Sequence, residues 1–115
     1  MRYLLLVHVD ESLMRQMTPE EDRANTEACI AYDQELDRRG LYIASNALQG
    51  PETATVVRVR NGKVSMTDGP YVETKEHLGG FILIEARDLN EAAKVAQDCP
   101  MANFGSIEVR PELEL

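Results

Sequence analysis

The sequence contains no tryptophan, and phenylalanine and tyrosine bring its aromatic share to only 5%. Hydrophobic residues nevertheless make up 43% of the 115 residues, which is enough to bury a core in one domain of ordinary size. We therefore expect a single domain over residues 1–115 with a mostly aliphatic core.

Cysteine is also scarce. Cys29 and Cys99 are too few for a disulfide framework, so we expect two reduced thiols in or near the core. The apolar run Met1–Val9 is followed by Asp10 and Glu11 rather than by small residues that could form a cleavage site. It is therefore typical of a buried strand and not of a signal peptide or a membrane span. These features predict a cytoplasmic protein with no membrane partner.

Positive charge is in short supply, and the formal net charge is −8. Such a chain is repelled by phosphate backbones and by anionic membranes. Arg58, Arg60 and Lys63 come closest to a basic patch, but acidic residues flank them. We therefore expect no nucleic-acid partner.

Motifs for metals and organic cofactors are missing too. The chain has neither C-x-x-C nor H-x-x-x-H, and no dinucleotide fingerprint. Gly79-Gly80 is not followed by the Lys-Ser/Thr of a phosphate loop. His8, Asp10 and Asp68 could converge on a metal, although nothing in their spacing requires it. We expect no cofactor and no metal.

Short runs with apolar or alternating character, bounded by turn signals, predict six strands. They cover Arg2–Val9, Leu41–Leu48, Thr53–Arg60, Lys63–Thr67, Gly80–Ala86 and Ser106–Arg110. Asn61-Gly62 is a strong hairpin signal between the third and the fourth strand.

Two helices are predicted between the strands. Thr18-Pro19-Glu20-Glu21 combines a cap, a proline at the first position and a capping box, and Gly40 suits the end of this helix. Asp88 and Glu91 repeat the capping spacing, and Pro100 ends the second helix. The expected inward stripes are Ala24, Ala28, Ala31, Tyr32 and Leu36, and then Leu89, Ala92, Ala93 and Ala96.

The predicted order is β-α-β, a β-hairpin, and β-α-β. Without the hairpin this is βαββαβ, the ferredoxin-like order. We expect an α+β fold whose antiparallel sheet has two helices on one face. The other face would carry Leu and Ile side chains with nothing in the chain to cover it, which predicts a homodimer.

A polar stretch, T-D-G-P-Y-V-E-T-K-E-H-L-G-G-F at Thr67–Phe81, separates two predicted strands. Long loops in small domains are usually functional or disordered, and its Gly, Pro and aromatic content favours order. Asp68-Gly69-Pro70 is typical of a turn. Asp68 either holds that turn or presents its carboxylate to a cleft as a general base or an orienting group.

Charged residues alternate later in this stretch. Glu73, Lys75 and Glu76 form either a solvated ion-pair cluster or a site where Lys75 binds a substrate carboxylate while a glutamate moves a proton. The Gly79-Gly80 pair either begins a strand tightly, with or without a bulge, or allows a ligand to approach the backbone.

His8 and His77 are the two histidines of the chain. His8 shares a strand face with Leu4 and Leu6, so it is either a satisfied structural residue or, if that face lines a cavity, a proton shuttle. Asp10 lies two residues further along the same edge. His77 belongs to the polar stretch and is expected near the cleft.

These residues resemble the YCII-related family, and in particular its DGPF-domain branch. The resemblance lies in Thr67–Glu76 and Leu78–Phe81, with support from R-Y-L-L-L-V at the start, Thr53–Arg58 and G-S-I-E-V-R-P near the end. Tyr71 replaces the phenylalanine that names the branch. The resemblance implies a dimeric ferredoxin-like domain related to the dimeric α/β barrels.

The resemblance also bears on function. Some relatives in the wider superfamily are similar to muconolactone isomerases and to dehydrochlorinases, which use a His–Asp pair, and branch members are often genomic neighbours of extracytoplasmic-function sigma factors. The YCII pattern has its histidine early in the first helix, where this chain has Asp22-Arg23-Ala24-Asn25.

Three hypotheses follow. The first is a small organic acid bound in a cleft, with cofactor-free lyase or isomerase chemistry. Its catalytic residues would be Asp68, His8 and Glu73, and its substrate-binding residues Lys75, Glu76, Tyr71, His77 and Gly80. The second is a non-catalytic module that binds a ligand or a regulatory partner in a sigma-factor circuit. The third is a dimer whose loop is purely structural.

Overall fold

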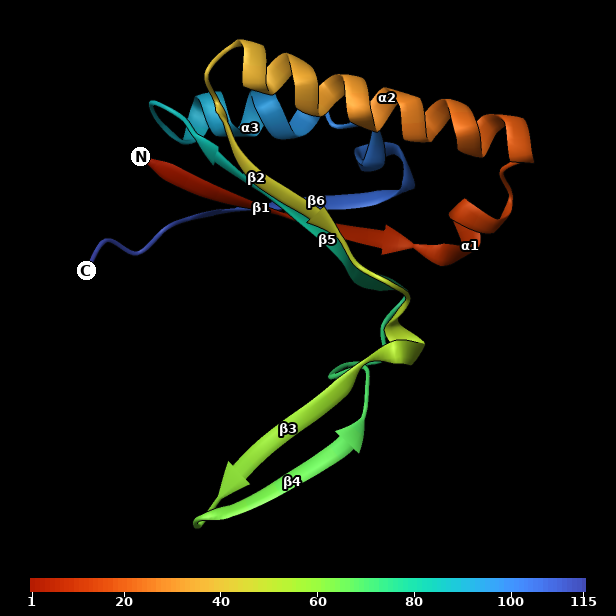
Figure 1. Cartoon of the computed structure of the whole chain (residues 1–115), viewed down its shortest axis with the longest axis vertical. Helices are drawn as coiled ribbons and strands as arrows, with labels where there is room; N and C mark the ends of the chain where they lie inside the picture. The colour runs from red at the N-terminus through yellow and green to blue at the C-terminus, as the bar shows by residue number, and fades with distance from the viewer.

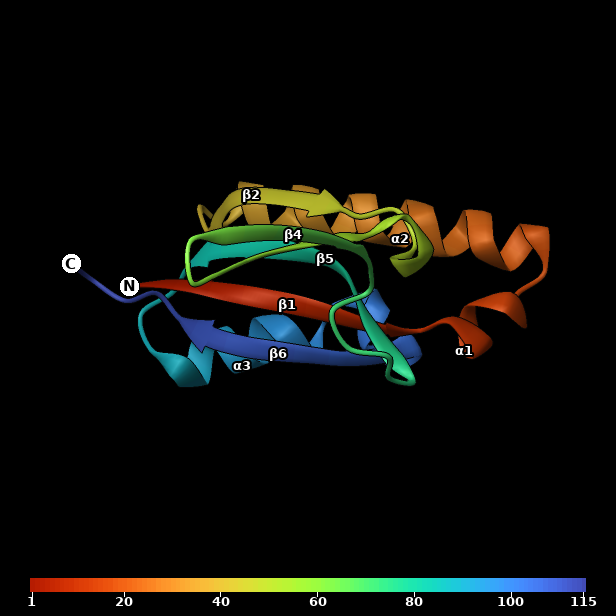
Figure 2. The ribbon, with the colours of Figure 1, turned by 90° about the horizontal axis from the view of Figure 1, so that it is seen from below.

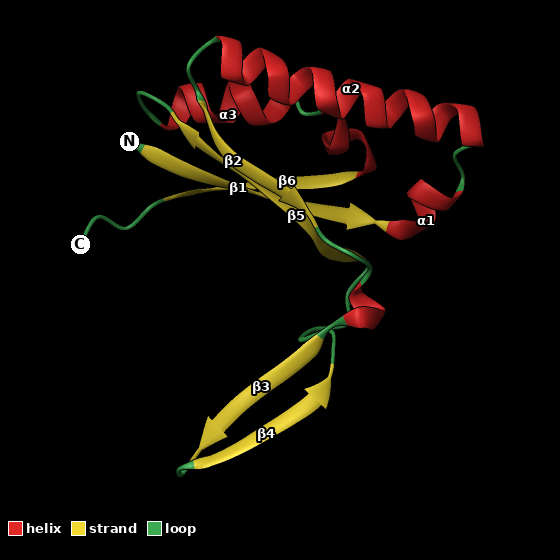
Figure 3. Cartoon of the chain, viewed as in Figure 1, coloured by secondary structure: helices red, strands yellow, loops and turns green.

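The computed structural model describes residues 1–115 and contains one four-stranded antiparallel sheet and a separate hairpin (Figure 1, Figure 3). The sheet has the order β2-β5-β1-β6 and consists of β1 (Arg2–Asp10), β2 (Tyr42–Ala47), β5 (Glu76–Glu85) and β6 (Gly105–Pro111). The hairpin pairs β3 (Thr55–Arg60) with β4 (Lys63–Asp68). This arrangement confirms the ferredoxin-like α+β fold with an inserted hairpin.

Three α-helices connect these strands: α1 (Glu11–Arg15), α2 (Pro19–Arg38) and α3 (Leu89–Gln97). Two short 3₁₀ helices, Pro51–Thr53 and Pro100–Phe104, precede β3 and β6. The long helices α2 and α3 lie on one face of the sheet, as expected (Figure 1, Figure 2). None of the helices combines the length and the apolar character that a membrane span requires.

Local signals set the ends of the two long helices. Thr18 Oγ1 accepts a hydrogen bond from Glu21 N at 3.1 Å, and Glu21 Oε1 accepts one from Thr18 N at 3.1 Å. Gly40 follows α2 with φ 75°, in the left-handed region that glycine adopts without strain. Asp88 caps α3 through Glu91 N at 2.9 Å. The predicted starts of both helices are thus confirmed.

The predicted inward stripe of α2 was partly wrong. Leu36 is buried and Tyr32 is half-buried, but Ala24, Ala28 and Ala31 are exposed. The inward positions are instead spaced by four, three and four residues and are occupied by Asn25, Cys29, Tyr32 and Leu36. Alanine suits every face of a helix, so its spacing says little about which face is buried.

The stripe of α3 needs a similar correction. Ala92, Val95 and Ala96 are buried, whereas Leu89 is 57% exposed and Ala93 is exposed. Leu89 is the first residue of the helix.

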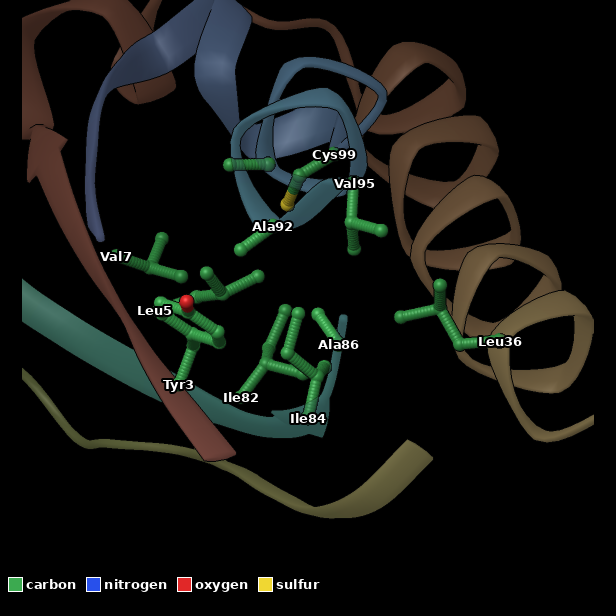
Figure 4. Packing of buried hydrophobic residues seen from close by; sticks show 11 residues of the cluster. Tyr3, Leu5, Val7, Leu36, Ile82, Ile84, Ala86, Ala92, Val95 and Cys99 are labelled. Carbon is green, nitrogen blue, oxygen red and sulfur yellow. The ribbon is translucent and has the colours of Figure 1, made fainter. Parts of the chain in front are cut away.

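The core lies between the helices and one sheet face. Tyr3, Leu5 and Val7 of β1 alternate into it, and Ile82 and Ile84 of β5 meet them from the neighbouring strand (Figure 4). The helices add Leu36, Ala92, Val95 and Ala96, and Cys99 joins them from the segment after α3. Each fully buried aliphatic side chain contributes about 1.5–3 kcal/mol relative to exposure. Both cysteine thiols are free, as expected.

The polar stretch is more regular than its composition predicted. Strand β4 continues to Asp68 and β5 begins at Glu76, so the connecting loop is only residues 69–75. Glu76, His77 and Gly80 therefore belong to a strand and lie opposite Asp10, Val9 and Val7 of β1. Pairing with a long central strand overrides the low strand propensity of these residues.

The sheet face without helices is apolar in its centre. Leu4 pairs with Leu83 and Leu6 with Phe81, and we call these four residues the open face. The hairpin β3–β4 projects from the body on the side of this face (Figure 1, Figure 2).

Candidate functional site

A cavity of about 540 Å³, the loop cavity, lies where β5 begins and the hairpin leaves the body. Its lining includes His8 from β1, Tyr71 and Thr74 from the loop, and Glu76 and His77 from β5. Four of the predicted site residues are therefore brought together: His8, Tyr71, Glu76 and His77. The lining contains no lysine and no arginine.

His8 is held by a carboxylate from another strand. Its Nε2 lies 2.9 Å from Glu108 Oε1, and the two side chains are 30% and 48% exposed. Antiparallel pairing of β1 with β6 places Glu108 opposite Leu6 and Ser106 opposite His8. Leu6 and His8 share the helix-free face of the sheet, so the side chains of Glu108 and His8 both lie on that face. An ionised carboxylate only accepts hydrogen bonds, so this contact assigns the proton of a neutral His8 ring to Nε2 and leaves Nδ1 as the basic nitrogen.

His77 is positioned by a β-bulge. Val7 pairs with Gly80 and His8 with Leu78, which leaves Gly79 as the extra residue of β5. His77 consequently pairs with Val9, on the helix-facing side. It also lines a second hollow of about 710 Å³, together with Glu11 and Arg15 of α1 and Asp22 of α2. His77 thus stands between two hollows.

Tyr71 connects the loop to the hairpin. The residue is 75% exposed, and the Arg58 guanidinium carbon of β3 lies 5.5 Å from the centroid of its ring, in cation–π geometry. Gly69 N donates to Ala54 O at 2.7 Å, and a Cβ at Gly69 would lie 2.6 Å from the Cβ of Ala54. The bond between Gly69 and Pro70 is cis. The close contact between Gly69 and Ala54 packs the base of the hairpin against the loop.

Lys75 contacts a carboxylate of the protein itself. Its Nζ lies 3.5 Å from Asp10 Oδ2, while Asp10 Oδ1 accepts hydrogen bonds from Ser12 Oγ at 2.6 Å and Ser12 N at 3.0 Å. The Ser12 hydroxyl is the main cause that lowers the pKa of Asp10; burial opposes this effect, and the Lys75 charge adds to it. Neither Asp10 nor Lys75 is among the residues that line the loop cavity.

Asp10 is the buried carboxylate of this region, with 4% exposure, and from the sequence it was a candidate only as one of three residues that could converge on a metal. It ends β1 and caps α1, a short helix that was also not predicted. The D-E-S order at the end of the strand could have revealed it, because an aspartate two residues before a serine is a common local cap.

The remaining predicted site residues lie elsewhere. Asp68 is exposed at the end of β4 opposite Thr55, and Glu73 is exposed with no ion pair. Gly80 is buried in β5, and a Cβ there would lie 2.8 Å from Asn46 O. Close approach of β5 to β2 therefore accounts for glycine at this position. No group of three or more His, Cys, Asp or Glu side chains is arranged to hold a metal ion.

Sheet order, inserted hairpin and loop together define a small ferredoxin-like α+β protein with a cavity at its strand ends. A sequence model of the YCII-related domain matches residues 1–115, and the chain belongs to this family. An uncharacterised protein of Rhizobium meliloti (strain 1021), R00369, is 35% identical over 113 residues, which cover 96% of this chain and 91% of that protein.

The solved structure of a 5-chloro-2-hydroxyhydroquinone dehydrochlorinase from Burkholderia phenoliruptrix AC1100 is similar in fold. That protein, in complex with 2,5-dihydroxybenzoquinone, matches with a TM-score of 0.57 and 17% identity, over 98% of this chain and 94% of its own. At this identity the similarity concerns the fold.

Proposed function

We propose that this protein binds a small organic acid in the loop cavity and that His8, oriented by Glu108, transfers a proton to or from it without a cofactor. The observation that carries the proposal is the 2.9 Å contact between His8 and Glu108 at a cavity that also has His77 and Glu76 in its lining. A volume of about 540 Å³ lies within the usual range for small-molecule sites.

The geometry supports a simple mechanism. Nδ1 of His8 takes a proton from a carbon next to a carbonyl group, and Glu108 stabilises the imidazolium that forms. The electron pair of the broken C–H bond then either expels a leaving group from the adjacent carbon, as in a lyase, or accepts a proton at another carbon, as in an isomerase. The lining contains no lysine or arginine, so positive charge facing an acidic ligand develops on His8 when it takes up the proton.

The named activity of the structural neighbour is of the same reaction class. A dehydrochlorinase removes HCl, which is an elimination that begins or ends with proton transfer. Its ligand, 2,5-dihydroxybenzoquinone, is an acidic hydroxyquinone and therefore a suitable first probe for this chain.

We also propose that the functional unit is a homodimer that buries the open face. Leu4, Leu6, Phe81 and Leu83 form a contiguous apolar centre on a face that no element of the chain covers. Stacking two such faces removes this surface from water. The free thiols suit a reducing compartment, for which we propose the cytoplasm.

Non-catalytic binding of a ligand or a regulatory partner is the second candidate. It is favoured by the position of Asp10, because this buried carboxylate with its shifted pKa is occupied by Ser12 and Lys75 and does not line the cavity.

The test is an NMR titration of ¹⁵N-labelled protein with 2,5-dihydroxybenzoquinone, combined with deuterium incorporation into the probe in D₂O. The proposal expects shifts at His8, Tyr71 and His77, and catalysed exchange that His8→Gln abolishes. Glu73→Gln is the control, since Glu73 lies in the same loop as Tyr71 but is not among the residues that line the cavity. Binding without exchange would favour the non-catalytic candidate. No shift with this probe or with simple carboxylic acids would refute ligand binding in the loop cavity.

A further inference from the structure

The hairpin β3–β4 is an amphipathic ribbon with no partner in its own chain. It forms a two-stranded sheet of its own, and its Asn61-Gly62 turn has φ angles of 54° and 73°. Pairing places Val57 opposite Met66 and Val59 opposite Val64, so these four side chains share one face, which we call the arm face. Arg58, Arg60 and Lys63 lie on the other face.

The arm face is open to solvent. Val57 and Val59 are each 57% exposed, Val64 is 62% exposed and Met66 is 70% exposed. An isolated two-stranded hairpin is marginally stable in water and needs packing on its apolar side. The arm face therefore requires an apolar partner surface, and no other element of the same chain packs against it.

The total exposed surface of the chain indicates the area of the interface with this partner surface. The chain exposes 8134 Å², whereas a compact monomer of 12.9 kDa exposes about 6,300 Å². Its radius of gyration is 16.0 Å, against about 13 Å for a compact domain of this length. The excess of roughly 1,800 Å² exceeds the roughly 800 Å² that each partner buries in a standard interface and matches one side of an obligate homodimer.

Two features indicate that a second copy of this chain supplies this partner surface. The chain carries both an apolar arm and an apolar open face, as a two-fold symmetric interface requires, because each partner then offers and receives the same patches. The excess of roughly 1,800 Å² of exposed surface is also about what one partner buries in an obligate homodimer.

We infer that the hairpin β3–β4 docks through its arm face on a second copy of this chain and that this docking holds one wall of the loop cavity. The connection to the cavity is structural. Tyr71, which lines the cavity, packs against Arg58 of the ribbon, and the lining also includes Thr53, Ala54 and Pro70 at the base of the ribbon. If the ribbon is not docked, its movement displaces the residues that form this wall of the cavity.

Sedimentation velocity of the whole chain tests the docking. The double variant Val59→Lys, Met66→Lys places two cations on the arm face. Ser65→Lys, Thr67→Lys places the same cations on the opposite face of the same strands. Since the charges are matched, a difference between the variants reports lost apolar contact. We expect the first variant to weaken the dimer by at least about 100-fold and the control to stay close to wild type.

Several outcomes would overturn the inference. A monomeric wild-type protein would show that no second copy covers the ribbon, and equal dimer affinity in both variants would place the interface elsewhere. Circular dichroism confirms folding, since neither variant touches the core. These readouts need no ligand, so they stand even if the proposed acid binding fails. If wild type binds 2,5-dihydroxybenzoquinone and the arm-face variant, as a monomer, binds it equally well, the claim about the cavity wall is refuted.

Discussion

His8 and Glu108 are 100 residues apart in the chain, yet the imidazole Nε2 lies 2.9 Å from the carboxylate Oε1. The contact exists because β1 and β6 are neighbours in the sheet, which brings the C-terminal strand to the end of the first one. It gives the loop cavity an oriented imidazole next to a negative charge.

Replacement of Glu108 by glutamine therefore tests the proposed chemistry. Glu108→Gln keeps the size of the side chain but removes the charge that stabilises an imidazolium, so we expect the rate of deuterium exchange into a bound acid to fall by about 10²–10⁴-fold. Binding of the probe should change much less. Glu112→Gln, on the same C-terminal segment but beside Arg2 at the opposite end of β1 from His8, should leave the rate unaltered. Equal rates in wild type and Glu108→Gln would remove Glu108 from the mechanism.

Asp10 should make the free energy of unfolding depend on pH in the acid range. Its pKa is lowered in the folded protein, chiefly by Ser12, so the unfolded chain binds this proton more readily. The stabilisation is complete above the unfolded pKa, about 3.9, and is lost as the pH falls towards the folded value.

This effect is measured by urea unfolding of wild type, Asp10→Asn and Ser12→Ala between about pH 3 and pH 7. The range extends about one unit below the usual carboxyl pKa. Both variants should be less stable than wild type at neutral pH, and the differences should shrink as the pH falls. A difference between wild type and Asp10→Asn that stays constant over the whole range would contradict the assignment.

Leu5 should be costly to truncate. It is fully buried with 0% exposure between the sheet and the helices, so Leu5→Ala should lower the free energy of unfolding by about 2–5 kcal/mol. Leu89→Ala is the control, because Leu89 is 57% exposed and should lose less than about 1 kcal/mol. Denaturant unfolding monitored by circular dichroism compares the two. Similar losses would mean that the core is not where the fold places it.

Adjacent glycines of β5 should respond differently to alanine. A Cβ at Gly80 would lie 2.8 Å from the backbone oxygen of Asn46, which cannot move without disturbing β2. A Cβ at Gly79 would meet the Cγ2 atom of Val9 at 2.6 Å, and this side chain can rotate away. Gly80→Ala should therefore cost about 1–3 kcal/mol of unfolding free energy, in the range of overpacked cores, and Gly79→Ala less. The reverse order in thermal or urea unfolding would refute the steric argument.

The parts of the fold that depend on neighbours in sequence could be predicted. The capping box at Thr18, the cap at Asp88 and the Asn61-Gly62 turn each involve groups only a few residues apart, and all three form as expected. The apolar alternation in β1 also identified both sheet faces. Such signals are local, and the competing structures for these segments are few.

Relations between distant strands could not be predicted in the same way. The composition of the polar stretch predicts a long loop because its residues are poor strand formers, but pairing of Glu76 and His77 with β1 makes half of it a strand. No spacing in the sequence reveals that Glu108 meets His8. The inward faces of the helices were obscured by alanine, which fits buried and exposed positions equally well.

The single extra residue at Gly79 decides which side of the sheet each histidine serves. In an unbroken register His77 would pair with Asp10 and share a face with His8, whereas the bulge pairs it with Val9 and turns it towards the helices. The two rings thus look out from opposite sides of the same pair of strands. Because both residues also line the loop cavity, a ligand there meets two imidazole groups that one extra residue has placed on opposite faces of the strand pair.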